Sequence, residues 1–144
     1  MLEEALRKTA EYARLKAALQ NGRSPAALFG LPPAARAEVA AALAADLQRP
    51  AIVVTAGEAE ATRFAADAAF FGARSAVCPV RDFTLHPTLG QSHEFEYRRI
   101  AVLGNIVGKR CNLLAVPLEA ALQRTMPRAE FEANTLTLKE GDSL

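Results

Sequence analysis

Short apolar runs alternate along the chain with longer segments in which apolar residues recur every three or four positions. The short runs are typical of strands and the periodic segments of amphipathic helices. The expected strands cover residues 26–30, 51–55, 75–80 and 112–116. The expected helices cover residues 2–20, 35–48, 57–71, 92–107 and 118–124, with a helical turn at 128–132. This alternation predicts an α/β fold in three layers, with helices on both faces of a mostly parallel sheet.

Local signals predict how several of these elements begin, end and pack. Asn21-Gly22 forms a suitable C-cap for the first helix, and Ser92 is a suitable N-cap for the helix that follows it. The run at 51–55 is apolar up to its last residue, which predicts a strand buried on both faces. In the helix after Ser92, four apolar side chains are expected to face the core: Ile100, Leu103, Ile106 and Val107.

The C-terminal segment does not follow this alternation of short apolar strands and amphipathic helices. Residues 135–138 alternate between polar and apolar side chains like a half-exposed strand, and no partner for such a strand follows. We therefore expect three parts: an N-terminal helix at 1–22, an α/β domain at 23–133, and the truncated start of a following domain at 134–144.

Composition narrows the function classes. The formal net charge of +1 on 144 residues argues against a strongly basic nucleic-acid surface. No apolar run approaches the roughly 20 residues that a membrane-spanning helix needs, so no membrane partner is expected. Cys78 and Cys111 lie far apart, each in an apolar run. This pattern favours buried, reduced thiols and a cytoplasmic location.

The segment from Gly30 to Ala37 suggests a degraded phosphate-binding loop. Laid on the pattern G-x-x-x-x-G-K-[ST], it keeps the first glycine, Gly30, while the last three positions hold Ala35, Arg36 and Ala37. Pro32 and Pro33 also remove two backbone amide donors. ATP hydrolysis is not expected here, although Arg36 and the helix N-terminus leave weak anion binding open.

The polar loop at 81–91 holds Asp82 and His86, and His93 lies close by in the sequence. Their spacing matches no metal site, so we expect a surface loop that Phe83 and Leu85 anchor to the core. A basic patch including Arg81, Arg98, Arg99, Lys109 and Arg110 is the alternative, although interleaved acids such as Glu96 dilute it. Because sites of parallel sheets lie at the carboxyl ends of strands, segments 30–36, 55–58, 81–91 and 117–119 are expected to share one rim.

Three stretches together resemble a known family. They are residues 22–30, residues 81–86 with 90–92 and 96–99, and residues 112–124 with 126–127. In this order they resemble the amino-terminal UvrB-like domain of the bacterial transcription-repair coupling factor (Mfd). The resemblance covers nearly the whole chain from about Gly22.

The resemblance implies a RecA-like fold (P-loop NTPase type) whose ATPase motifs have decayed, with no catalytic residue, metal or cofactor in this segment. It implies a scaffold within an ATP-dependent DNA translocase that displaces stalled RNA polymerase in nucleotide excision repair. Neighbouring domains would be partners, UvrA mainly through the following domain, and RNA polymerase and DNA through other domains, with ATP and magnesium in the motor. The implied interaction surface comprises Arg81, Asp82, Phe83, His86, Glu96, Tyr97, Arg98 and Arg99.

Two other functions remain open at this point. One is an NTP-binding α/β enzyme domain with an atypical phosphate loop. The other is a standalone regulatory α/β domain unrelated to DNA repair.

Overall fold

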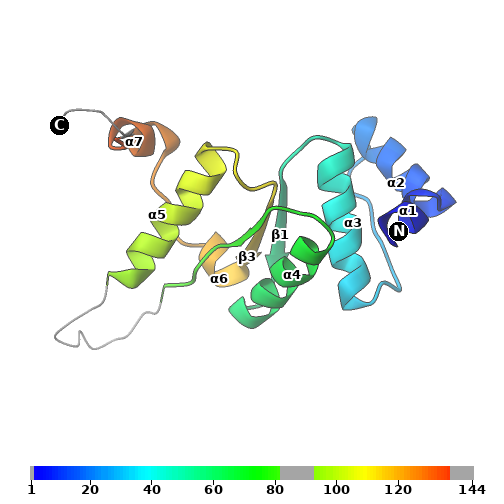
Figure 1. Cartoon of the computed structure of the whole chain (residues 1–144), viewed down its shortest axis with the longest axis horizontal. Coiled ribbons are helices and arrows are strands. Elements are labelled where there is room, and N and C mark those ends of the chain that lie inside the picture. The colour runs from blue at the N-terminus through cyan, green and yellow to red at the C-terminus, as the bar shows by residue number, and fades with distance from the viewer. Residues whose placement is uncertain (1, 82–92, 137–144) are drawn as a thin grey trace.

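Three short parallel strands lie at the centre of the structure, a computed structural model that describes residues 2–81 and 93–136 (Figure 1). The strands are β1 (Ala51–Thr55), β2 (Ser75–Val77) and β3 (Leu113–Pro117), in the order β1-β3-β2. Leu113 in the middle strand is in register with Ala51 on one side and Ser75 on the other. The parallel sheet that the alternating pattern predicted is therefore present.

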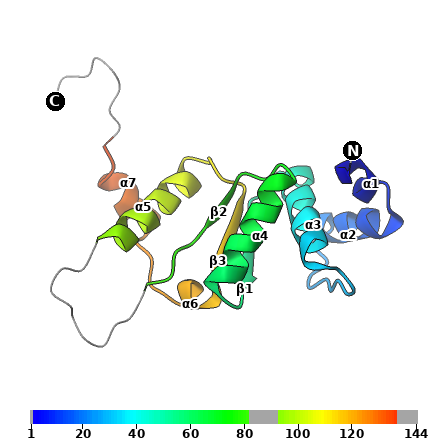
Figure 2. The same ribbon diagram turned by 60° about the horizontal axis from the view of Figure 1, so that its bottom comes forward.

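Helices surround this sheet and connect its strands. They are α1 (Leu2–Arg7), α2 (Ala10–Gln20), α3 (Pro33–Asp46), α4 (Glu58–Phe70), α5 (Glu94–Val107), α6 (Leu118–Ala121) and α7 (Arg128–Ala133). Helices α3 and α4 pack against each other and against the same face of the sheet, whereas α5 lies on the opposite side (Figure 2). The described chain thus has the layered α/β architecture. None of its described helices has the length and apolar character needed to cross a membrane.

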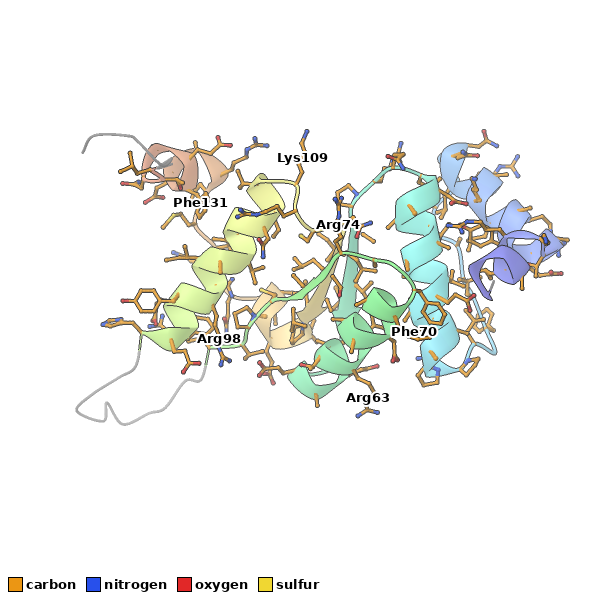
Figure 3. The ribbon with its side chains drawn as sticks, in the orientation of Figure 1. Arg63, Phe70, Arg74, Arg98, Lys109 and Phe131 are labelled. Carbon is orange, nitrogen blue, oxygen red and sulfur yellow. The ribbon has the colours of Figure 1, made fainter. Side chains whose placement is uncertain are left out.

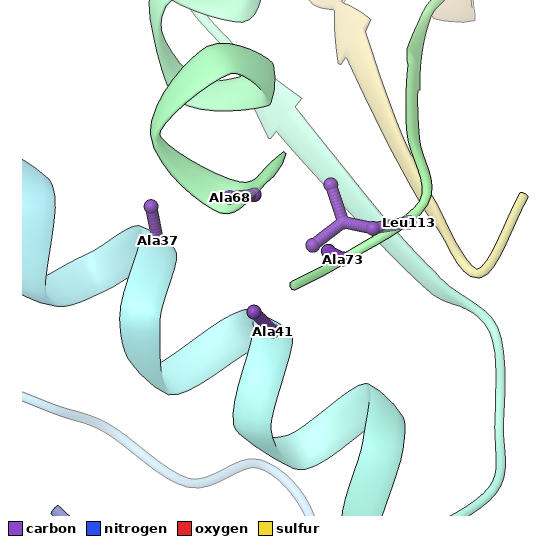
Figure 4. Close-up of a cluster of buried hydrophobic side chains, with 5 residues drawn as sticks. All are labelled: Ala37, Ala41, Ala68, Ala73 and Leu113. Carbon is purple, nitrogen blue, oxygen red and sulfur yellow. The ribbon is translucent and has the colours of Figure 1, made fainter. Parts of the chain in front are cut away.

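The core between α3, α4 and β3 is built largely from alanine. Ala37 and Ala41 of α3 meet Ala68 of α4 and Ala73, with Leu113 of the central strand completing the cluster (Figure 4). Small side chains let the two helices approach each other and the sheet closely. Leu113 and Pro117 are the largest side chains that this structure buries fully, so much of the packing around Leu113 depends on one large residue.

The N-terminal segment forms two helices, so the prediction of one helix over 2–20 is wrong. Thr9 adopts an extended backbone conformation and its side chain accepts a hydrogen bond from the Tyr12 amide at 3.3 Å, which makes Thr9 the N-cap of α2. Threonine competes for backbone hydrogen bonds in this way and favours a cap over a helix interior. The predicted C-cap is confirmed, since Asn21 ends α2 and Gly22 has a φ of 69°.

The strand predicted at 26–30 is absent, and the described part of the one predicted at 135–138 is not in a strand. Residues 26–30 pair with no strand, and Phe29 is 90% exposed. An isolated extended segment gains nothing from strand pairing, so its apolar composition alone does not make it a strand. Thr135 and Leu136 are also outside any strand, because the Thr135 hydroxyl donates to the Phe131 carbonyl at 2.6 Å at the end of α7. The remainder of the predicted strand at 135–138 lies outside the described residues.

Burial also differs from the predictions for β1 and α5. Strand β1 was expected to be buried on both faces, but Ile52 is 70% and Val54 57% exposed. In α5, Ile100 and Ile106 are exposed rather than in the core. Helices α3 and α4 cover one face of β1, and on the other side of the sheet α5 lies over Leu114 and Val116 of β3 and over Cys78. In the described part of the chain, this other face of β1 is therefore largely exposed.

Several element boundaries shift by a few residues. The strand predicted over 75–80 ends at Val77, before Pro79, and the one predicted over 112–116 runs from Leu113 to Pro117. Helix α6 ends at Ala121 rather than near Arg124. The predicted N-cap Ser92 lies outside the described residues, and His93 takes the N-cap position of α5 without a side-chain hydrogen bond.

Candidate functional site

The segment predicted as a degraded phosphate loop forms a turn and a helix start. Gly30 has a φ of 75°, which is the left-handed conformation that glycine adopts at little cost. Pro32 is the N-cap of α3 and Pro33 its first residue, as expected for prolines that need no amide partner. However, no strand precedes this turn. The strand–turn–helix arrangement predicted around Gly30 is therefore wrong.

The remaining residues of this segment serve packing and the turn itself. The Arg36 Nε donates to the Leu31 carbonyl at 3.0 Å, so its guanidinium closes the turn in front of α3. Ala37 is fully buried in the alanine core, and Ala35 is half-buried. Weak anion binding by Arg36 stays a prediction.

A strand–loop–helix turn of the phosphate-loop kind does occur, between β1 and α4. The strand ends at Thr55, Ala56 and Gly57 form the turn, and α4 begins at Glu58. This turn follows a strand of the parallel sheet and opens a helix, which is the context that phosphate loops require. The sequence alone identifies residues 55–58 only as one segment of the expected rim, because these residues match none of the key positions of a phosphate loop.

When the pattern G-x-x-x-x-G-K-[ST] is aligned with residues 54–61, none of its key positions holds the required residue. Val54 and Ala59 replace the two glycines, Glu60 replaces the lysine, and Ala61 replaces the hydroxyl residue. Glutamate reverses the charge that would contact the terminal phosphates. Ala61 is fully buried and carries no oxygen for magnesium. This turn therefore has the position of a phosphate loop between a strand and a helix, but it consists only of Ala56 and Gly57 and has none of the loop's chemical groups.

The Glu60 carboxylate also uses one of the donors of this turn. Its Oε2 accepts a hydrogen bond from the Ala56 amide, 3.1 Å away. The Thr55 hydroxyl, on a buried residue, donates to the Gly57 carbonyl at 3.1 Å. A working phosphate loop directs its backbone amides at the ligand. Here the Ala56 amide donates instead to the Glu60 carboxylate of the same chain, so it is not available to a phosphate.

The electrostatics of this turn favour its own acids over an external phosphate. Glu58 and Glu60 lie in the first turn of α4, where the helix dipole stabilises negative charge. A phosphate that approached the same helix end would meet two carboxylates and would need to displace the bond to Ala56. The turn is thus stabilised without a ligand.

The structure brings together only parts of the predicted rim among the described residues. A recess of about 280 Å³ separates the start of α3, at Pro33 and Arg36, from Glu60, Arg63 and other residues of α4. Thr55 of β1 is in register with Pro117 of β3, so these two strand ends adjoin. The rest of the predicted rim, at 82–91, lies outside the described residues.

A second candidate site is a cleft of about 620 Å³ between α5 and the segment around α6. Its apolar lining includes Phe95, Ile100 and Leu103 of α5 and, from the other wall, Leu122 and Met126. Leu122 is 81% exposed and Met126 42%. Apolar clefts with such exposed side chains are typical of binding surfaces. The sequence analysis did not identify Phe95, Leu122 or Met126, because neither wall is apolar enough to stand out alone.

Arg99 connects the two walls of this cleft. Its guanidinium donates to the hydroxyl of Thr125 at 2.6 Å, to Oε1 of Gln123 at 3.3 Å and to the carbonyls of Gln123 and Arg124. The same guanidinium lies 6.0 Å from the centroid of the Phe95 ring. Arg99, predicted to belong to an interaction surface, is thus a structural connection within the cleft wall.

Two more predicted surface residues lie at the same cleft. Arg81 and Glu96 form an ion pair at 3.4 Å, and the Arg81 backbone exchanges two hydrogen bonds with the Gln123 side chain. Tyr97 is 69% exposed and Arg98 pairs with Glu94 on the exposed part of α5; neither lines the cleft. Asp82, Phe83 and His86 lie outside the described residues.

The cysteines are half-buried and free. Burial raises the pKa of the Cys78 thiol, and the nearby positive charge of Arg99 offsets this only in part. A raised pKa keeps the thiol protonated and weakly nucleophilic.

Among residues 2–81 and 93–136, no three His, Cys, Asp or Glu side chains are grouped so that they could hold a metal ion. Comparison of the chain with protein-family models, with curated proteins and with solved structures gave no match. The two features of the described chain that bear on function are the turn between β1 and α4 and the cleft beside α5.

Proposed function

We propose that this chain is a non-catalytic, UvrB-like module of RecA-like fold within a cytoplasmic transcription-repair coupling factor (Mfd). In this proposal the module is a scaffold, and ATP-driven movement on DNA takes place in motor domains elsewhere in a longer polypeptide. Contacts with UvrA are made mainly through the following domain. RNA polymerase and DNA are bound through other domains.

The observation that carries this proposal is the turn between β1 and α4. It has the position of a phosphate loop, between a strand of the parallel sheet and a helix, but Glu60 stands where the lysine would be and its carboxylate accepts a hydrogen bond from the Ala56 amide. A loop that its own carboxylate caps is suited to structural support and unsuited to phosphoryl transfer. A decayed loop within a retained α/β fold supports the assignment to a family whose amino-terminal ATPase motifs have decayed.

The cleft beside α5 supports a scaffold role. Its walls are held by Arg99 and Gln123, while Leu122 and Met126 remain exposed for a partner. A preformed cleft with apolar anchors and a charged rim matches the anatomy of a protein interface. We assign this cleft to contacts with a neighbouring domain of the same polypeptide.

The loss of nucleotide chemistry is tested by calorimetric titration of the chain with ATP and magnesium. We expect no binding heat and no hydrolysis. The matched variant Glu60→Gln removes the negative charge and keeps the size of the side chain. Its titration with ATP shows whether repulsion by the carboxylate alone prevents binding, or whether the missing lysine, glycine and hydroxyl groups do so. Magnesium-dependent hydrolysis by the unmodified chain that Arg36→Ala abolishes would contradict the proposal.

The family assignment has its own test. The proposal expects a longer reading frame that encodes a helicase motor, whereas a gene that stops at Leu144 contradicts it. In the longer protein, Leu122→Asp should weaken association of this module with its neighbours by about tenfold or more, as expected for loss of an apolar anchor. The exposed control Leu136→Asp should change association less than threefold. Equal effects of the two variants would argue against the cleft.

A further inference from the structure

Three helix-to-strand turns of this fold each carry positive charge. Arg49 lies between α3 and β1, Arg74 directly precedes β2, and Lys109-Arg110 separate α5 from β3. In each turn a residue with positive φ ends the helix: Gln48, Gly72 and Lys109. All four cationic side chains are exposed. The same local geometry thus presents a cation at the start of every strand.

The sheet topology brings these turns to one edge. Because the strands are parallel, their amino ends lie together, with Ala51 and Ser75 in register on either side of Leu113. Neighbouring strands are about 4.8 Å apart, so the three turns span roughly 10 Å. Figure 3 shows Arg74 and Lys109 at the end of the sheet where the strands begin. We call Arg49, Arg74, Lys109 and Arg110 the amino-edge cluster.

None of the four cations of the amino-edge cluster has a carboxylate partner among the described residues, whereas six of the twelve other described lysines and arginines form ion pairs. Arg7, Arg14, Lys16, Arg81, Arg98 and Arg128 all form ion pairs. By contrast, Arg110 Nε donates to the neutral Asn105 amide oxygen at 3.1 Å. The nearest acid in sequence to Arg49 is Asp46, which already binds Arg7, Lys16 and Tyr12. The positive charge at this edge is therefore uncompensated by described acids.

Cations after helix C-termini also have a purely structural explanation. They balance the negative end of the helix dipole, which is worth a few tenths of a kcal/mol to about 1 kcal/mol each within the last turn. Arg74 lies four residues beyond the end of α4, outside that range. The dipole thus explains part of the cluster and leaves Arg74 unexplained.

We propose that the amino-edge cluster binds the phosphate backbone of a nucleic acid. Three of its four cations are arginines, whose planar forks match phosphate oxygens. Duplex DNA carries about one negative charge per 1.7 Å of axis with both strands counted, so a 10 Å length holds roughly six phosphates, about three on each strand. This charge density suits four unpaired cations better than a folded acidic protein surface, in which charges are sparse. This contact would be additional to the DNA binding that the proposed function gives to other domains, and its test does not depend on that function.

The test is fluorescence anisotropy of a labelled DNA duplex titrated with the chain at several salt concentrations. For four phosphate contacts we expect log K to fall with log salt at a slope of about −3 to −4. The variant Arg49→Gln/Arg74→Gln/Lys109→Asn/Arg110→Gln should bind at least tenfold more weakly at low salt. Single-stranded DNA and duplex RNA arms identify which backbone is preferred, and binding of any of them through the cluster supports the proposal.

A matched control distinguishes binding by the amino-edge cluster from a general effect of the chain's positive charge. Lys8→Gln/Arg14→Gln/Arg23→Gln/Arg128→Gln removes the same charge from exposed positions elsewhere and should change affinity less than threefold. Circular dichroism checks that both variants fold; if the cluster variant does not, Arg74→Gln alone should still weaken binding about threefold or more. Equal affinity of the cluster variant and the unmodified chain, or no binding at low salt, would overturn the proposal. Equal competition by polyglutamate would also overturn it, in favour of an acidic protein.

Discussion

The hydroxyl of Tyr12 donates to Asp46 Oδ2 at 3.1 Å, which joins the N-terminal helix α2 to the end of α3. The same carboxylate binds Arg7 Nε at 3.0 Å and Lys16 Nζ at 3.2 Å. Asp46 lies in the last turn of α3, where a negative charge is unfavourable to the helix dipole. Its three donors offset this cost, so one carboxylate fastens α1 and α2 to the α/β domain.

Replacing Asp46 by alanine should destabilise the chain by about 1 to 3 kcal/mol, because it removes three charge-assisted or hydroxyl hydrogen bonds. Urea denaturation followed by circular dichroism measures the change. Glu11→Ala removes an exposed ion pair with Arg14 and should cost less than about 0.5 kcal/mol. Equal effects of the two substitutions would show that Asp46 does not fasten the N-terminal helices.

Stability should also fall in acid through Asp46. Burial alone would raise the pKa of Asp46, but hydrogen bonds from Lys16, Tyr12 and Arg7 outweigh burial and hold it below 3.8. Because the folded pKa is depressed, the stabilisation is complete above the unfolded pKa and is lost as pH falls through the folded one. Asp46→Asn should therefore flatten the acid limb of a plot of unfolding free energy against pH. An unchanged slope would contradict this.

The Tyr12 hydroxyl should lose its proton at a higher pH than an exposed tyrosine. Burial first, then the hydrogen bond and charge of Asp46, raise the pKa of Tyr12 from 10.0 to about 12. A raised folded pKa means that the stabilisation is complete below pH 10.0 and is lost as pH rises toward 12. Phenolate absorbance in a Tyr97→Phe background isolates Tyr12, and Asp46→Asn should lower its pKa. A Tyr12 that titrates normally in the folded chain would show that it is not buried.

Arg99 and its neighbour Arg98 should differ in importance. Arg99→Met removes the hydrogen bonds to Thr125 and Gln123 and should destabilise the chain by about 1 to 3 kcal/mol. Arg98→Met removes only an exposed pair with Glu94 and should cost less than about 0.5 kcal/mol. Thermal unfolding compares the two variants. Restoration of full stability by Arg99→Lys would contradict the role of the planar guanidinium.

The two faces of the sheet should tolerate truncation differently. Leu113→Ala should cost about 3 to 5 kcal/mol, because Leu113 is fully buried among alanines that cannot fill the cavity. Ile52→Ala removes a side chain that is 70% exposed and should cost less than about 1 kcal/mol. Denaturant midpoints test both values. A larger loss from Ile52→Ala would mean that the open face of β1 is covered in solution.

Local sequence signals predicted the fold class and many helix ends. The apolar run at 51–55, the periodic segment of α4 and the cap at Asn21-Gly22 each depend on residues that are neighbours in the chain. Pro33 likewise starts a helix because its own ring sets φ. Such features follow from backbone sterics and hydrophobic periodicity, which act over a few residues.

The candidate site was only partly accessible to the same reasoning. Gly30 matched a phosphate-loop position, but residues 26–30 have no strand partner, and partners come from distant parts of the chain. The turn before Glu60 was recognisable only once β1 was paired with β3. The bond from the Ala56 amide to Glu60 depends on a side-chain conformation that no residue pattern encodes.

By itself, then, the sequence determined the alternation of strands and helices and the loss of the lysine and the hydroxyl residue from the phosphate-loop pattern at residues 30–37. Only the tertiary structure decided the strand order, the open face at Ile52, and the meeting of Arg49, Arg74 and Arg110 at one edge. The physical reason is that burial and charge clustering arise between segments far apart in the chain. Their positions depend on how the sheet pairs and on which helix covers which face.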